Sequence, residues 1–430
     1  MTQTDSLPSA PVQPADPASA AAAGRDTAAS RIAIIGGGPA GLMAAEILSA
    51  AGRGVDVYEA LPSAGRKFLM AGRGGLNITH SEPLDRFLSR YGAARPLFER
   101  LLARFSPADL RAWCAGLGVP TLVGSSGRVF PEGFKASPLL RAWLARLAAQ
   151  GVRLFLRHRW SGWDEAGRLC FDTPSGRVEV QPLATVLALG GASWPRLGSD
   201  GRWAPLVQAR GVGLAPFRPS NSGFDIAWGP GFLERAEGQP LKRIALGFAG
   251  RTVPGELVIT RSGLEGGALY ALSAPVRDAL ERDGQATVLL DLKPDLSPAQ
   301  IQNKLARVPA ADSLANRLRK ALSLTPPVGA LLRELCRPED LVRPAALAAR
   351  IKAVPLVFTG MRGLDRAIST AGGIRLDELD ANLMLRRCPG LFACGEMLDW
   401  EAPTGGYLLQ GCMASGVGVA EGVLSWLHDH

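Results

Sequence analysis

The sequence predicts an α/β fold in which a second domain interrupts a parallel sheet. The first observation is a glycine turn that joins an apolar run to a helix near the N-terminus. The second is an apolar run near the C-terminus that ends in glycine and returns to the same sheet. The third is the change of character between them, where proline is frequent and amphipathic helices follow strand-like runs. With 430 residues and 47% hydrophobic content, the chain can hold two or three domains with sizeable cores.

The glycine turn has the pattern of a dinucleotide-binding βαβ unit. An apolar run at 32–35 leads into Gly-x-Gly-x-x-Gly and a helix, and a second apolar run at 55–58 ends in an acid. The first glycine permits a tight turn, the second leaves room for a pyrophosphate, and the third lets helix and strand pack closely. The helix N-terminus attracts phosphates, and the acid can accept hydrogen bonds from a ribose diol. The residues expected at the dinucleotide are Gly36, Gly38, Pro39, Ala40, Gly41, Glu59 and Ala60.

The next segment predicts backbone that passes close to a ligand, because residues 61–82 are irregular and rich in glycine. Ser137-Pro138 then predicts the start of a helix. Residues 152–180 predict three short strands, and a further strand at 184–189 ends in glycine. A meander that returns to such a strand is typical of a flavoprotein nucleotide domain. The ligand contacts expected in this part are Arg66, Lys67, Gly74, Asn77 and Gly190.

The middle of the chain, residues 198–355, predicts an inserted domain. Strand-like runs occur at 256–260 and 286–292, and Ser297-Pro298 predicts a helix start by its N-cap. No second dinucleotide pattern occurs in this region. The insert is therefore not a second nucleotide-binding domain.

The C-terminal segment completes the expected pocket. Residues 389–396 predict a buried strand that ends in glycine and an acid, and a loop then leads to a glycine pair and a long helix. The acid can bind a polyol chain that leaves a pyrophosphate. The N–H groups at the helix start could face an isoalloxazine ring, where positive potential stabilises negative charge on the reduced ring. We therefore expect a resident FAD, held here by Gly395, Glu396, Gly405, Gly406, Tyr407 and Leu408.

Together these motifs resemble the BaiN-like family of bacterial NAD(P)/FAD-dependent oxidoreductases, over about residues 31–425. The resemblance rests on the stretches 35–41, 65–67, 72–79, 370–373 and 395–407. It implies a Rossmann-like FAD-binding domain of the glutathione-reductase type, with a β-meander, made of residues 31–197 and 356–430. A β-barrel with helices, residues 198–355, is implied as the insert.

The resemblance also distributes the contacts along the cofactor. It places Lys67 on the adenosine and pyrophosphate side, and Asn77 on the ribityl and flavin side with the C-terminal motif. One stretch departs from the family, because many members read Gly-Gly-Gly-Arg-Cys-Asn where this chain has residues 72–77, Gly-Arg-Gly-Gly-Leu-Asn. The arginine is displaced by two positions and Leu76 replaces the cysteine. The substrate can therefore differ from that of relatives.

The motifs and the resemblance predict an FAD enzyme that takes hydride from NAD(P)H at flavin N5. It would pass the hydride to a small organic acceptor, and the resemblance favours a conjugated C=C bond. Such a reduction needs a proton donor and a group that stabilises an oxyanion. The catalytic candidates near the expected ring are Tyr407, His80 and Arg73, each with an ordinary structural role also open to it. Two alternatives stay open: a tRNA-modifying flavoprotein, and a flavin-binding redox sensor without turnover.

Composition argues against several other classes. Six scattered cysteines without a CxxC pair fit reduced thiols, and neither they nor the four histidines have metal-ligand spacing, so no metal site is expected. The net charge of +9 comes mostly from dispersed arginines, with only seven lysines, so we expect a small-molecule substrate and no nucleic-acid partner. Residues 1–30 lack the features of a signal peptide and predict a disordered tail. No uninterrupted apolar run reaches the ~18 residues that span a bilayer, so we expect a cytoplasmic protein without a membrane partner.

Overall fold

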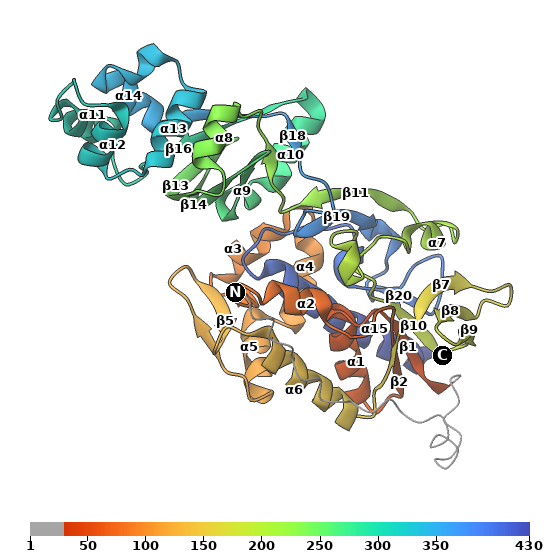
Figure 1. Ribbon diagram of the computed structural model, residues 1–430. Coiled ribbons are helices and arrows are strands. Elements are labelled where there is room, and N and C mark those ends of the chain that lie inside the picture. The colour runs from red at the N-terminus through yellow and green to blue at the C-terminus, as the bar shows by residue number, and fades with distance from the viewer. Residues whose placement is uncertain (1–29) are drawn as a thin grey trace.

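A five-stranded parallel sheet forms the centre of one of two units (Figure 1). The computed structural model describes residues 30–430, so the expected disordered tail lies outside the described residues, Ser30 excepted. All four strand pairings are parallel. Numbered in chain order, the strands run 3-2-1-4-5 from one edge of the sheet, which is the strand order of a Rossmann fold. From the opposite edge they are β20 (Leu391–Ala393), β10 (Ala184–Leu187), β1 (Ile32–Ile35), β2 (Val55–Glu59) and β6 (Arg153–Leu156).

Two helices pack closely against each other beside this sheet, α1 (Pro39–Ala50) and α15 (Tyr407–Asp429). Gly416 permits the approach, because a Cβ there would meet the carbonyl of Ala40. By length and composition α15 could cross a membrane, but 72% of its most apolar window is buried within the protein, as in a core helix. The other helices of this unit are α2 (Arg66–Ala71), α3 (Leu84–Leu88), α4 (Arg95–Arg104), α5 (Pro107–Gly116), α6 (Ala136–Ala149) and α7 (Ala204–Gln208).

The expected meander is present as an antiparallel sheet of β7 (Arg159–Trp163), β8 (Leu169–Thr173) and β9 (Gly176–Val180). The sequence predicts three strands in residues 152–180, whereas the structure has four. The additional strand is β6, which pairs with β2 at the edge of the parallel sheet. Arg153 anchors it there with two hydrogen bonds of 2.6 Å to the Asp56 carboxylate.

A seven-stranded antiparallel sheet forms the second unit, at the upper left of Figure 1. Its strands run in the order β17 (Val354–Phe358), β16 (Ala286–Asp291), β13 (Pro240–Phe248), β14 (Arg251–Thr260), β15 (Gly263–Glu265), β12 (Phe224–Asp225) and β18 (Gly360–Met361). Within residues 30–430 no pairing joins the outermost strands, so the expected closed barrel is not confirmed. The helices of this unit are α8 (Pro230–Ala236), α9 (Gly267–Tyr270), α10 (Ser273–Asp283), α11 (Pro298–Ala306), α12 (Leu314–Leu322), α13 (Pro326–Leu335) and α14 (Pro344–Lys352).

The two units have separate hydrophobic cores. Trp203, which the sequence assigns to the insert, packs in the core of the parallel sheet. Beyond it, β11 (Leu214–Ser220) pairs with β19 (Ser369–Ile374), and the chain enters and leaves the second unit at the end of this two-stranded ribbon. We therefore propose that the insert begins near Asn221 and ends near Ile368. Both boundaries lie later in the chain than those of the expected insert, residues 198–355.

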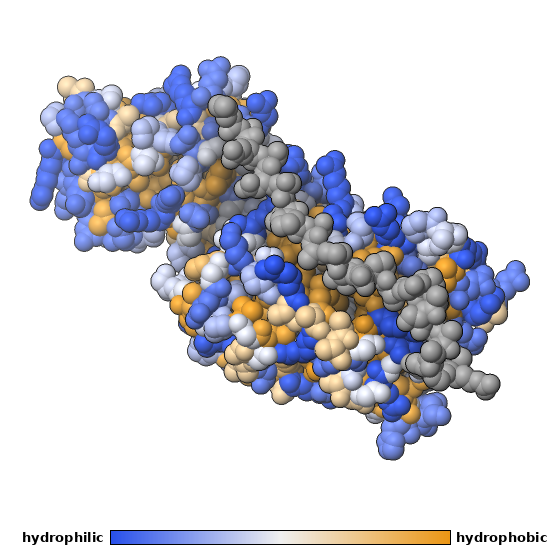
Figure 2. Space-filling model, turned by 60° about the horizontal axis from the view of Figure 1, so that its bottom comes forward, coloured by the Kyte–Doolittle hydropathy of each residue, from blue (hydrophilic) through white to orange (hydrophobic). Residues whose placement is uncertain are grey.

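The surface is mixed in character on both units. Figure 2 shows hydrophilic residues over much of the visible face, with hydrophobic residues scattered among them. On the second sheet Leu289 and Val357 are 45% and 40% exposed. Single exposed apolar side chains of this kind are ordinary in soluble proteins and mark no site by themselves.

Candidate functional site

The carboxyl ends of three neighbouring strands meet at one edge of the parallel sheet. Gly36 follows β1, Gly190 follows β10 and Gly395 follows β20. The chain order reverses between β1 and β10, which makes this edge a topological switch point. Ligands of open α/β sheets bind outside such an edge. The predicted glycines of three separate sequence segments are thus brought to one place.

The glycine turn after β1 has the shape that a pyrophosphate requires. Gly36 has a φ of +114°, and a Cβ there would meet the carbonyl of Ala188. A Cβ at Gly41 would meet the carbonyl of Gly36, so helix α1 lies as close to β1 as the pattern predicts. At Gly38, by contrast, no atom of the described residues lies within 4 Å of the Cβ position, apart from the glycine itself and its two chain neighbours. This open space lies at the N-terminus of α1, which begins at Pro39, and it fits a bound phosphate group.

Glu59 lies beside this turn at the end of β2. Its Oε2 accepts a hydrogen bond from the Gly37 N–H at 3.0 Å, and its Oε1 accepts one from the Leu61 N–H at 2.9 Å. Burial raises the pKa of Glu59, and the two backbone hydrogen bonds oppose that rise. The carboxylate therefore faces the turn, where an adenosine ribose would place its hydroxyls.

An ion pair joins the two halves of the Rossmann unit across the site. Lys67 Nζ donates to Glu396 Oε2 at 2.6 Å, although the residues are 329 positions apart. Lys67 also donates to Ser193 Oγ at 3.1 Å, and Glu396 Oε1 accepts from the Thr370 N–H at 3.0 Å. Gly190 lies next to the pair, since a Cβ there would be 3.9 Å from Glu396 Oε2. Sequence reasoning names Lys67, Glu396 and Gly190 but gives no sign that the two charges meet.

The start of α15 packs onto the strand β3 (Thr79–His80). Gly406 has a φ of +90°, and a Cβ there would lie 2.5 Å from Thr79 Cα. The Oγ1 of Thr79 is buried and has no hydrogen-bond partner among the described residues. The side-chain Nδ2 of Asn77 donates hydrogen bonds to the carbonyls of Thr79 and Val129, at 2.8 and 3.0 Å. Gly406 therefore permits the close packing of α15 on β3, which brings the start of α15 beside Thr79.

Two of the three catalytic candidates lie together, around a carboxylate that sequence reasoning missed. The Tyr407 hydroxyl donates to Glu82 Oε1 at 2.6 Å, and Arg90 donates to both oxygens of Glu82 at 2.9 and 2.7 Å. His80 stacks on Tyr407 with ring centroids 5.6 Å apart. Its Nε2 pairs with the Ser126 carbonyl at 3.0 Å and its Nδ1 accepts from the Glu82 N–H at 3.0 Å. Glu82 can be recognised as a site residue only from the fold, which brings β3 and the start of α15 together.

Within this cluster the pKa of Tyr407 is raised and that of Glu82 is lowered. Burial raises the pKa of Tyr407, and its hydrogen bond to Glu82 raises it further. Burial would by itself raise the pKa of Glu82, but the hydrogen bonds from Arg90 and Tyr407 outweigh it, so this pKa lies below its usual value. At neutral pH the cluster therefore holds a neutral tyrosine, an ionised carboxylate and a guanidinium.

The remaining predicted residues lie apart from this cluster. The Arg73 side chain is exposed, and among residues 30–430 it makes no hydrogen bond or ion pair, although its backbone N–H donates to the Met70 carbonyl at 3.1 Å. Gly74 next to it faces open space. Arg66 donates to Ser63 Oγ at 3.3 Å, while its buried Nε has no hydrogen-bond partner among residues 30–430. Ala60 and Leu408 are half-buried and Ala40 is buried in the first turn of α1. Their cofactor contacts stay predictions.

Within the described part of the chain, no three His, Cys, Asp or Glu side chains are grouped to hold a metal ion. The six cysteines are free thiols there. The polar chemistry of this site is thus that of carboxylates, cationic side chains and backbone N–H groups.

Comparison with known proteins identifies the family. The model described as the HI0933-like protein Rossmann domain matches residues 30–422. The chain belongs to the HI0933-like family. This is a family of FAD-binding flavoprotein oxidoreductases, which confirms the resemblance drawn from the motifs.

Several relatives match nearly the whole chain, among them the following two. The 3-dehydro-bile acid delta(4,6)-reductase of Clostridium scindens is 28% identical over 414 residues, which cover 90% of this chain and 97% of that protein. The ribosomal RNA dihydrouridine synthase of Haemophilus influenzae is 26% identical over 395 residues, which cover 89% of this chain and 95% of that one. Among solved structures, a 3-ketosteroid-delta4-(5alpha)-dehydrogenase from Rhodococcus jostii has 17% identity and a TM-score of 0.49, covering 95% of this chain and 98% of that chain.

Proposed function

We propose that this protein is an FAD-dependent reductase that uses NAD(P)H to reduce a carbon–carbon double bond conjugated to a carbonyl group. The observation that carries the proposal is the chemistry that the names of the two relatives share. A delta(4,6)-reductase of a 3-dehydro bile acid acts on double bonds conjugated to a ring ketone. Dihydrouridine is uridine whose ring double bond, conjugated to a carbonyl, has been reduced. The substrates differ, but the reacting group is the same.

The residues of the site support binding of FAD along the sheet edge. When bound, FAD supplies the centre that accepts and donates hydride. The open space at Gly38 and the N-terminus of α1 accommodate the pyrophosphate, and Glu59 accepts hydrogen bonds from the ribose. The paired Lys67 and Glu396 offer a cation toward the pyrophosphate and an anion toward the polyol chain that leaves it. The first N–H groups of α15 have no intrahelical acceptor and favour negative charge near them.

The reduction also needs a proton and a group that stabilises the oxyanion. The Tyr407 hydroxyl is committed to Glu82, and both ring nitrogens of His80 are engaged, so these residues hold α15 and β3 in place. Among the three candidates, Arg73 alone has donors that no described residue takes up. A guanidinium keeps its proton but stabilises an oxyanion by hydrogen bonds. We therefore assign oxyanion stabilisation to Arg73 and proton delivery to water.

A second candidate function is the same reduction on an RNA base. The relative named as a ribosomal RNA dihydrouridine synthase favours it, as does the net charge of +9. The dispersion of the arginines and the count of seven lysines favour a small molecule instead. This candidate differs from the expected tRNA-modifying flavoprotein in its RNA class and shares its need for a basic surface.

Anaerobic reduction tests both candidates. Purified protein reconstituted with FAD is mixed with NADH and then with NADPH, and loss of the visible flavin absorbance is followed. The reduced protein is then mixed with a steroid 4-en-3-one, a simple cyclic enone, or unmodified ribosomal RNA. We expect one nucleotide to reduce the flavin and an enone to reoxidise it, with a saturated ketone detected by mass spectrometry.

The other outcomes separate the alternatives. Reoxidation by RNA alone, with dihydrouridine in the product, would establish the second candidate in place of the first. Failure of both nucleotides to reduce the bound flavin would support a redox sensor without turnover. Arg73→Gln is the matched variant, because it removes the guanidinium from an exposed side chain; it should slow reoxidation by the enone and leave reduction by NAD(P)H unchanged.

A further inference from the structure

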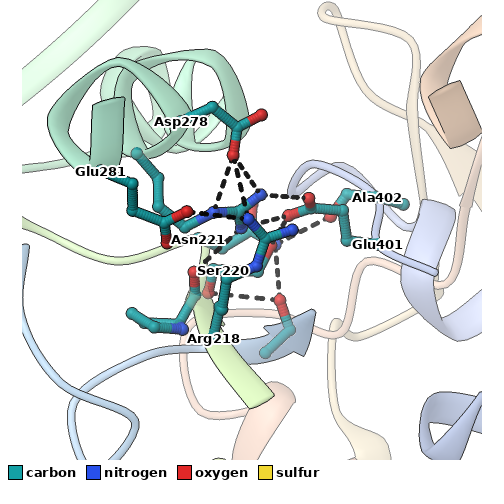
Figure 3. A network of polar contacts seen from close by, with 10 residues as sticks. Arg218, Ser220, Asn221, Asp278, Glu281, Glu401 and Ala402 are labelled. Atoms are coloured by element: carbon teal, nitrogen blue, oxygen red, sulfur yellow. Dashed lines mark hydrogen bonds and ion pairs between the residues drawn. The ribbon is translucent and has the colours of Figure 1, made fainter. Parts of the chain in front are cut away.

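The loop that precedes α15 is held by the inserted unit as well as by its own. Residues 398–404 contact α10 of the insert and the end of β11, as Figure 3 shows for Glu401 and Ala402. The loop begins after Glu396 and leads into Gly405 and the start of α15. It therefore connects the two parts of the candidate site that the C-terminal segment supplies.

Arg277 and Glu401 form the central pair of this contact. Nη2 of Arg277 donates to Oε1 of Glu401 at 2.7 Å, and Nη1 donates to Oε2 at 3.0 Å. The Arg277 side chain is 3% exposed. Ser220 Oγ donates to the same carboxylate at 2.7 Å, and Arg277 Nη1 also donates to the Pro219 carbonyl at 3.2 Å. A bidentate guanidinium–carboxylate pair fixes orientation as well as distance, so it sets the position of the loop relative to α10.

Asn221 joins the same loop to the point where the chain enters the insert. Its Nδ2 donates to the Ala402 carbonyl at 2.8 Å and to Ser369 Oγ at 2.7 Å, and its Oδ1 accepts from the Thr404 N–H at 3.1 Å. Its φ of +52° lies in the left-handed region, which asparagine tolerates better than most residues. The entry strand, the exit strand and the loop thus meet at one buried side chain.

Arg277 Nη2 also pairs with Asp278 at 3.1 Å, and the remaining ion pairs of this contact belong to Arg218 at its exposed edge. Arg218 on β11 contacts Asp278 at 3.4 Å and Glu281 at 3.0 Å on α10, and its own side chain is 39% exposed. No hydrogen bond or ion pair of Arg218 reaches loop 398–404 among the described residues. Exposed pairs of this kind contribute little to stability. Arg218 therefore offers a control at the same interface.

We propose that Arg277 is a positioning residue for the candidate site: through Glu401 it places the loop that carries the start of α15. Correct seating of the insert is then required for electron transfer at the bound FAD. The part of this inference that concerns turnover rests on the proposed function, whereas the part that concerns bound FAD does not. The Arg277–Glu401 pair acts on bound FAD through the backbone N–H groups at the start of α15, because these groups move with the loop.

The test uses a double variant, Arg277→Met with Glu401→Leu. Removing only one partner would leave the other charge buried and unpaired, whereas removing both charges does not. The double variant is therefore expected to fold with the melting temperature of the parent. FAD should stay bound. Its reduction potential should become more negative, because a displaced helix N-terminus stabilises negative charge on the reduced ring less well. The rate of its reduction by NAD(P)H should fall about tenfold.

Two further variants complete the design. Arg277→Lys keeps the charge and loses the bidentate fork, so it should give a smaller shift in the same direction, and it carries the test if the double variant does not fold. Arg218→Gln should leave both the potential and the rate at the parent values. The proposal is overturned if the double variant and Arg277→Lys keep the parent potential and rate, or if Arg218→Gln shifts them equally.

The potential is measured by dye-coupled reduction, which requires neither NAD(P)H nor an acceptor. If the parent reduces no conjugated double bond, the proposed function fails while the comparison of potentials still stands. If the potentials are equal while the parent reduces an enone, the positioning role fails and the proposed function stands. If the variants lose stability and turnover together while the potential stays at the parent value, Arg277 serves the fold alone and the proposal fails.

Discussion

The two ends of the candidate site are built in different ways. At the turn end, Glu59 accepts a hydrogen bond from Gly37, only 22 residues earlier in the chain, within one βαβ unit. At the helix end, the Tyr407 hydroxyl reaches Glu82 across 325 residues, and Lys67 reaches Glu396 across 329. The turn end is determined by local chain geometry. The helix end exists only once residues 67–82 and 396–407 have been brought together, so substitutions at the two ends should fail in different ways.

The largest expected effect, at the turn end, is a loss of FAD binding in a protein that still folds. Gly38→Val adds a side chain where, apart from the chain neighbours of Gly38, no atom of residues 30–430 lies within 4 Å, and the φ of −86° at this position is ordinary. The protein should fold with the melting temperature of the parent, and FAD binding should be lost because the side chain fills the pyrophosphate position. The measurement is the FAD released per chain on denaturation, together with thermal unfolding.

Gly36→Val is the contrasting variant. Its φ of +114° and the nearby carbonyl of Ala188 leave no place for a side chain, so the folded protein itself should be lost. Equal FAD content in Gly38→Val and the parent would show that the pyrophosphate lies elsewhere. A stable Gly36→Val protein would show that the turn can relax.

The sequence predicts the turn end nearly completely and the helix end only in part. The glycine pattern and the acid are local, so Gly36, Gly41 and Glu59 have the surroundings expected of them. Glu396 and Tyr407 are recognisable as site residues, but their partners carry no local signal. Glu82 lies in an irregular segment, and Arg277 lies on a helix of the insert, where an arginine ordinarily faces solvent.

Helix starts show the same limit on a smaller scale. Ser297 caps α11 as predicted, with its hydroxyl accepting from the Gln300 N–H at 3.2 Å. Ser137 is predicted to cap a helix in the same way, yet α6 begins at Ala136 with Lys135 before it. A proline is tolerated throughout the first turn, where N–H groups have no intrahelical acceptor, so Pro138 does not by itself fix the start.

An intermediate effect is expected for the ion pair that closes the helix end. Lys67→Met leaves the Glu396 carboxylate, 7% exposed, without its cation. The free energy of unfolding should fall by about 2–3 kcal/mol, since a buried charge is left unpaired. Urea unfolding at neutral pH measures this loss, and FAD affinity should fall with it.

Lys320→Met is the matched control in the insert. Lys320 pairs with Asp312 at 2.8 Å, but its side chain is 47% exposed. Its removal should cost no more than about 1 kcal/mol, because water replaces the lost partner. Equal losses in the two variants would mean that the Lys67–Glu396 pair behaves as a surface pair and does not join the two chain ends.

The smallest expected effect is a pH-dependent one at the start of α15. Tyr407→Phe removes the hydroxyl that donates to Glu82, and unfolding at pH 7 should become easier by about 1–2 kcal/mol. The pKa of Glu82 lies below its usual value in the folded protein, so the stabilisation by its ionised form is fully present above the unfolded value of about 4.5. It is lost as the pH falls through the lower folded value. The gap between parent and variant in urea unfolding should therefore shrink in acid, and a gap that is as large below pH 4 as at pH 7 would mean that the hydroxyl acts through packing and not through the charge on Glu82.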